Sequence, residues 1–227
     1  MLVTVTERLP IFPLGTVLFP GLILPLHIFE DRYRKLISDL LALPDSVPRR
    51  FGVVAIRSGR EVGHDGVQAL YEVGCTAELR QVQRHSDGRY DVMAVGGGRF
   101  TVAALHPAVP GDYLSAEVGM LPEPAGDLAE TAIRAAAAFT RYQAALVGMR
   151  GEPVVTGDLP NDPVLLSYLI PAAVVMPLND RQKFLECPDA ASRLRLAVET
   201  IESELAAIAA LPSLPATDIT TGGWSPN

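Results

Sequence analysis

The apolar positions near the start of the chain form a long run that prolines interrupt. Residues 9–29 are nearly all apolar, yet Pro10, Pro13, Pro20 and Pro25 lie among them. Each proline removes a backbone donor and fixes φ, so the run cannot form one continuous helix. A spanning helix with these defects would leave carbonyls unpaired in hydrocarbon, and the basic region of a secretory leader is missing. We therefore predict short buried strands joined by turns, and no membrane insertion.

A helix and a set of short strands follow this run. Apolar residues at i, i+3, i+4 and i+7 predict a helix over residues 30–43; they are Tyr33, Leu36, Ile37 and Leu40. Alternating or continuous apolar residues then predict strands; these cover residues 51–57, 73–80, 90–95, 100–105 and 114–120. Asp87-Gly88 predicts a hairpin turn, and the glycines at 96–98 predict another turn. The set favours a strongly bent antiparallel sheet or a partly closed barrel.

From residue 121 onward the apolar spacing becomes helical. It predicts helices over residues 127–147, 162–170 and 179–186, and a last helix that Asp189 caps. Asp162 followed by Pro163 is typical of a helix start. Asn179 and Gln182 have the spacing of a capping box. The second half of the chain is therefore predicted to be all helical.

The last helix carries a regular apolar stripe, formed by Leu194, Val198, Ile201, Leu205 and Ile208. This stripe is predicted to pack within the chain, with a coiled-coil homodimer as the alternative. We therefore predict an α+β fold in three parts. A β-barrel subdomain with one helix covers residues 1–121, an α-helical bundle covers residues 122–211, and a flexible tail covers residues 212–227.

Charge and cysteine content narrow the classes of function. The formal net charge is −7, and the excess of carboxylates lies in the second half of the chain. A nucleic-acid-binding protein usually presents a clustered basic face, so this balance argues against that class. Cys75 and Cys187 are the only cysteines and form neither a metal-ligand pattern nor a disulfide framework. We therefore predict a cytoplasmic protein.

The sequence contains none of the common catalytic patterns. Lys35 and Lys183 are the only lysines, and neither follows a glycine as a Walker A loop requires. Both lie among charged residues, whereas the lysine of a Ser-Lys dyad must be desolvated. The chain also lacks a GxSxG, an HExxH and a GxGxxG that opens a helix after a strand. We predict that the protein is not an enzyme.

The histidines and paired carboxylates allow weaker interpretations. His27 and Glu30 could ligate a metal if they were helical, but a packed or capping histidine is the favoured interpretation. Asp87 and Asp91 are better explained as the flanks of a hairpin than as a catalytic pair. We therefore predict no cofactor and no metal.

Several segments together resemble a known family. They are LPIFPLGTVLFPGLILPLHIFEDRYR (9–34), FGVVAI (51–56), LYEVGCTAELRQVQRHSDGRYDVMAVGGGRF (70–100), and NDPVLLSYLI, NDRQKFLE and ASRLRLAVETIESEL within residues 161–205. The pattern is similar to the N-terminal substrate-binding domain of Lon-type ATP-dependent proteases. It is more similar to bacterial proteins made of that domain alone, because the sequence stops at the helices and shows neither an ATPase nor a Ser-Lys protease module.

The resemblance implies a PUA-like β-barrel followed by a helical bundle. It also implies a non-catalytic module that binds exposed apolar segments of unfolded polypeptides, of protein clients or of a protease partner. The opening run carries more large apolar groups than a small barrel is expected to bury, and an exposed remainder would mark an interaction site. The candidates are Phe19, Leu22 and Ile23, with burial in the core as the alternative for each. A PUA-like nucleic-acid-binding protein is the alternative function, and a small-ligand pocket or an unrecognised hydrolase is a third.

Overall fold

The structure, a computed structural model, describes residues 6–59, 67–106, 108–109, 111–150 and 157–210. The predicted tail over residues 212–227 lies outside these ranges. The strands are β1 (Thr6–Leu14), β2 (Ile23–Ile28), β3 (Arg50–Gly59), β4 (Val67–Leu70), β5 (Val73–Arg84), β6 (Tyr90–His106) and β7 (Leu114–Met120). The helices are α1 (Asp31–Leu41), α2 (Ala129–Arg150), α3 (Pro163–Ala173), α4 (Leu178–Glu186) and α5 (Ala190–Ala210). The α+β fold predicted from the sequence is confirmed.

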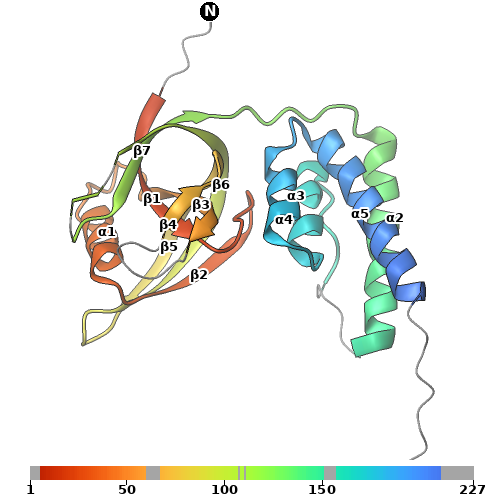
Figure 1. Ribbon diagram of the computed structural model, residues 1–227, viewed down its shortest axis with the longest axis horizontal. Helices are drawn as coiled ribbons and strands as arrows, with labels where there is room; N and C mark the ends of the chain where they lie inside the picture. The colour runs from red at the N-terminus through yellow and green to blue at the C-terminus, as the bar shows by residue number, and fades with distance from the viewer. Residues whose placement is uncertain (1–5, 60–66, 107, 110, 151–156, 211–227) are drawn as a thin grey trace, which may run out of the picture.

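The strands form a barrel-like ring, and the four later helices lie together on one side of it (Figure 1). Hydrogen bonding follows the order β1-β7-β6-β5-β3, and a β1–β3 pairing closes the ring. The prediction of an antiparallel sheet holds for every pairing of the described strands except β1–β3, which is parallel. β2 hydrogen-bonds to the first half of β6, and β4 pairs with β3.

Close packing of the ring requires glycine at two positions. Phe100 of β6 is fully buried in a small cluster inside the ring. A Cβ at Gly52 of β3 or at Gly74 of β5 would lie 2.7 or 2.6 Å from the tip of the Phe100 ring. β3 and β5 therefore pass the Phe100 side chain only because they lack side chains of their own at Gly52 and Gly74.

β6 differs from its prediction, because the glycines at 96–98 do not turn the chain. β6 runs unbroken through them, and none of the three has a positive φ. Instead they permit close approach: a Cβ at Gly96 would lie 2.1 Å from the Phe19 carbonyl oxygen, and one at Gly97 would lie 2.5 Å from Thr76 Oγ1. Because these glycines lack side chains, the segment at Phe19 and the neighbouring strand β5 can approach β6 closely.

The helical half confirms most of the predicted elements and corrects two details. Asp162 accepts a hydrogen bond from the Val164 N–H at 2.9 Å and caps α3 as predicted. α3 continues through Pro171 instead of ending at residue 170. The capping box predicted at Asn179 is wrong, because α4 begins after Pro177 without a side-chain cap. None of the helices in the described ranges combines the length and the hydropathy needed to cross a bilayer.

The apolar stripe of α5 packs inside the chain. Leu194, Val198 and Ile201 are buried, and Leu205 and Ile208 pack against the same core. α2 and α5 lie side by side in Figure 1 and make extensive contact. This packing confirms the intramolecular interpretation of the stripe over a coiled-coil seam.

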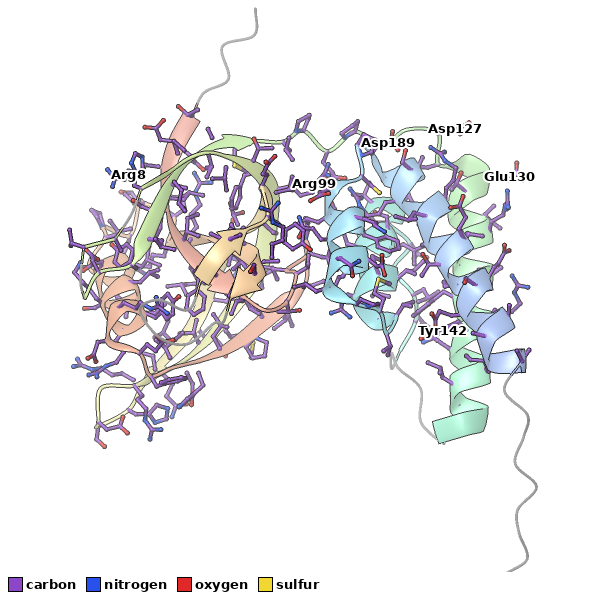
Figure 2. The ribbon with its side chains drawn as sticks, viewed as in Figure 1. Arg8, Arg99, Asp127, Glu130, Tyr142 and Asp189 are labelled. Atoms are coloured by element: carbon purple, nitrogen blue, oxygen red, sulfur yellow. The ribbon has the colours of Figure 1, made fainter. Side chains whose placement is uncertain are left out.

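A buried polar network joins the ring to the helices. Arg99 of β6 lies between the two halves (Figure 2), where its guanidinium donates to the carbonyl oxygens of Leu185 and Cys187 at 2.8 and 2.6 Å. It also pairs with Glu123 at 2.9 Å. The second oxygen of Glu123 pairs with Arg193 of α5 at 3.0 Å.

The network continues into α3 and α4. The Arg193 guanidinium lies 3.8 Å from the centre of the Tyr168 ring and donates to Ser167 Oγ at 2.7 Å. The Tyr168 hydroxyl donates to Glu123. Gln182, predicted to be part of a cap, instead donates to the Val73 carbonyl oxygen of β5 at 3.0 Å. These bonds satisfy charges that would otherwise be costly to bury, and they hold the helices against the ring.

Candidate functional site

The structure separates the three residues that the sequence suggested as an exposed patch. Phe19 is only 1% exposed and packs against Tyr168 of α3, with 6.1 Å between ring centroids. Burial in the core, the alternative given for each candidate, therefore holds for Phe19. The cause is the turn that follows it, which docks on α3 so closely that a Cβ at Gly21 would lie 2.5 Å from Leu165 Cδ1.

The other two candidates lie on the far side of this turn. Leu22 is partly buried and packs against the main core. Ile23, the first residue of β2, has 66% of its surface exposed. Of the three candidates, Ile23 alone presents a largely free side chain.

Strand alternation gathers further apolar groups beside Ile23. Successive residues of β2 point to opposite faces, so Ile23, Pro25 and His27 share the outer face. The register with β6 sets Val95 opposite Ile23 and Met93 opposite Pro25. We call these four apolar residues, Ile23, Pro25, Met93 and Val95, the apolar row.

Sequence reasoning identified Ile23 but missed the other three residues of the apolar row. Alternation in residues 90–95 places Met93 and Val95 on one face of their strand, and that signal is visible in the sequence. The pairing of β2 with β6 is not visible there, because about 60 residues separate the two strands and no turn signal joins them.

A surface groove of about 640 Å³ lies along the same face. Its lining combines three residues from each of three neighbouring strands, namely 25–27 of β2, 91–93 of β6 and 81–83 of β5. Pro25 and Met93 supply its apolar wall, whereas Gln81 and Gln83 supply amides. The groove is open, mixed in polarity and framed by regular strands, which suits an elongated ligand better than an enclosed small molecule.

His27 and Asp91 form the polar end of the groove, and His85 adjoins them through Asp91. Asp91 Oδ1 lies 2.6 Å from His27 Nδ1, and Asp91 Oδ2 lies 2.7 Å from His85 Nε2. These hydrogen bonds, that of His27 first and that of His85 second, hold the pKa of Asp91 below its usual range. The interpretation of His27 as a packed or capping residue is wrong, because its half-exposed ring belongs to this surface cluster.

Local structure accounts for Asp87 and for Cys75. Asp87 accepts from the backbone N–H and the guanidinium of Arg89, so it serves the hairpin turn as predicted. Within the described ranges, no group of three or more His, Cys, Asp and Glu side chains is arranged to hold a metal ion. The Cys75 thiol is buried, and burial raises its pKa well above the range of a reactive thiolate.

Comparison with known sequences gives a consistent result. Residues 8–203 match the family model described as the ATP-dependent protease La (LON) substrate-binding domain. The chain is 30% identical over 207 residues to Lon protease 2 of Sorangium cellulosum, an alignment that covers 88% of this chain and 25% of that protein. It is 27% identical over 202 residues to Lon protease of Escherichia coli (strain K12), covering 87% of this chain and 25% of that protein. The chain thus spans about a quarter of the length of these relatives.

Solved structures share the fold. A Lon N-terminal domain protein from Xanthomonas campestris superposes with a TM-score of 0.58 at 20% identity, covering 88% of this chain and 98% of that chain. The N-terminal domain of the Mycobacterium avium complex Lon protease gives 0.57 at 20% identity, covering 86% and 98%. The family match spans both the ring and the helices, and the chain therefore belongs to the Lon substrate-binding domain family.

Proposed function

We propose that this protein is a non-catalytic module that binds other polypeptides through the apolar row. The observation that carries the proposal is the exposure of Ile23 beside Pro25 and Met93, on a rigid sheet in a member of a substrate-binding family. The partner is an exposed apolar segment of an unfolded client or of a protease. The free thiols Cys75 and Cys187 suit a reducing cytoplasm, where such clients arise.

The physical basis is the removal of apolar surface from water. Complete burial of an isoleucine side chain contributes about 1.5–3 kcal/mol, so one such contact can change an affinity by about tenfold. Apolar side chains gathered on one surface usually mark an interaction site. The neighbouring Gln81 and Gln83 can hydrogen-bond a bound backbone without adding a formal charge.

A binding experiment with matched variants tests the proposal. The probe is a fluorescently labelled, unfolded casein-like polypeptide, and its affinity is measured by anisotropy. Ile23→Ser and Met93→Ser are expected to weaken binding about tenfold each. Ile133→Ser is the matched control, because Ile133 is 71% exposed but lies on α2, away from the apolar row.

The outcomes separate the proposal from its alternatives. Equal affinity of Ile23→Ser and the wild-type protein rules out the apolar row as the binding surface. Retention on single-stranded RNA with a steep salt dependence would instead favour a nucleic-acid partner. ATP turnover or peptide-bond cleavage by the purified protein would overturn the non-catalytic assignment.

A further inference from the structure

The backbone of β2 presents one edge that no described strand covers. Gly96 N–H donates to the Leu22 carbonyl oxygen at 2.8 Å, and the register continues with Ile23 opposite Val95. In an antiparallel pair, hydrogen-bonded and non-hydrogen-bonded positions alternate. Ile23, Pro25 and His27 are therefore at the positions whose backbone groups point away from β6.

The composition of this edge agrees with that register. Pro25 lacks an N–H, and it occupies a position where an N–H would find no partner on β6. The edge still offers the N–H groups of Ile23 and His27 and the carbonyl oxygens of all three residues. In the described part of the chain, β2 pairs with β6 alone.

A second feature adjoins the same edge. A slot of about 160 Å³ lies between the end of β1 and β2, and apolar groups of Phe12, Leu14, Leu26 and Phe29 line most of it. Phe29 is among the exposed large apolar residues. A strand added to β2 would place its outward side chains beside the apolar row and its inward side chains at this slot.

The carboxylates of Asp91 and Glu30 beside the edge already have partners within the protein. Asp91 is held by His27 and His85, and Glu30 pairs with Arg32 at 3.0 Å. A charged side chain of a ligand would have to displace one of these partners, whereas an uncharged segment would not. The backbone N–H and C=O groups along the outer edge of β2 have no described strand to bond to. An extended backbone is the ligand that fits them.

We propose that β2 binds an uncharged, apolar segment of a partner polypeptide as an added β-strand. The proposal rests on the proposed function and specifies the conformation of the bound segment. Backbone hydrogen bonds at Ile23, Pro25 and His27 supply affinity that depends little on sequence. The apolar row and the slot select apolar side chains on the two faces of the strand.

The test uses a heptapeptide of alternating leucine and threonine and two methylated versions of it. One version carries N-methyl groups on the leucines, the other on the threonines, so that each loses the donors along a different edge of the extended peptide. All side chains are kept, and contact with the apolar row is therefore available to all three peptides. Affinity for the wild-type protein is measured by anisotropy.

Strand addition predicts an asymmetric result. One methylated peptide is expected to bind at least tenfold more weakly than the other, because only one edge of the peptide faces β2. With the leucines beside the apolar row, loss with methylated leucines indicates antiparallel pairing, and loss with methylated threonines indicates parallel pairing. Equal affinity of both methylated peptides and the parent overturns strand addition and leaves the proposed function intact. Failure of the parent peptide to bind, together with failure of unfolded casein, overturns both.

Amide hydrogen exchange locates the bound strand. The amides of Ile23 and His27 are expected to exchange rapidly in the free protein and to slow at least tenfold with the parent peptide, whereas the Leu24 and Leu26 amides, bonded to β6, change little. Slow exchange of Ile23 and His27 in the dilute free protein would show that the chain itself, or a second copy, already covers the edge. Such slow exchange would overturn the proposal under either explanation. Sedimentation at several concentrations shows whether a second copy is the cause.

Discussion

Single residues in this fold are constrained most strongly where another segment of the same backbone passes close by. Gly96 illustrates this, because its missing Cβ would lie 2.1 Å from the Phe19 carbonyl oxygen. Gly96→Ala is therefore expected to destabilise the protein by about 2–3 kcal/mol, since one strand must shift. Gly148→Ala is the matched control: this helical position has open space around it and should gain about 0.5–1 kcal/mol. Urea denaturation measures both changes, and equal stability of the two variants would contradict the close approach.

The cap of α5 makes the second prediction at the residue scale. Asp189 Oδ1 accepts from the Ser192 backbone N–H at 2.6 Å, and this bond holds the pKa of Asp189 below its usual range. Asp189→Ala should cost about 1 kcal/mol at neutral pH, whereas Asp189→Ser should retain most of the cap.

The pH dependence of this cap follows from the sign of the shift. Because the folded pKa is lowered, the stabilisation is complete above the unfolded value of about 3.9 and is lost as pH falls through the folded value. The stability difference between wild type and Asp189→Ala, measured by thermal unfolding, should therefore shrink as pH falls below about 4. A constant difference from pH 7 to pH 2 would show that the charge of Asp189 is irrelevant to the cap.

At the scale of elements, Glu123 joins β6, α3 and α5 through one carboxylate. It pairs with Arg99 and Arg193, whose side chains are almost completely buried, and accepts from the Tyr168 hydroxyl. Glu123→Gln leaves two buried guanidinium groups without a counter-charge. The side chain of Glu123 is itself partly exposed, so the expected cost is about 2–3 kcal/mol, at the low end for a broken buried pair.

The control for this prediction lies on the helical surface. Glu202 is exposed and approaches Arg141 only to 3.9 Å, so Glu202→Gln should change the free energy of unfolding by less than about 0.5 kcal/mol. Chemical denaturation of both variants gives the comparison. A Glu123→Gln protein as stable as Glu202→Gln would mean that water replaces the carboxylate at little cost.

Across the whole molecule, local patterns could be predicted from the sequence and long-range contacts could not. The apolar spacing of Tyr33 to Leu40 predicted α1, and Asp162 predicted the start of α3, because neighbouring residues determine both. Gln182 resembled part of a cap, but its side chain bonds to the Val73 carbonyl oxygen. His27 and His85 both contact Asp91, and His27 does so only because β2 pairs with β6. Ile23 was identified within the candidate patch, whereas its cross-strand partner Val95 depends on a register that no local signal specifies.

Phe19 connects the two halves of the molecule and allows a test of the whole fold. One continuous apolar core includes residues of the strands and of all four later helices, and Phe19 packs within it against Tyr168. The ring and the helices should therefore unfold together. Phe19→Ala should lower the free energy of unfolding by about 3–5 kcal/mol. The unfolding midpoints measured from the helical signal at 222 nm and from the tyrosine near-ultraviolet signal should fall to the same value.

Ile23→Ala is the control, because it removes an exposed side chain and should leave both midpoints nearly unchanged. Two separate transitions in Phe19→Ala would show that the halves are stable independently, and that the contact between them only fixes their orientation.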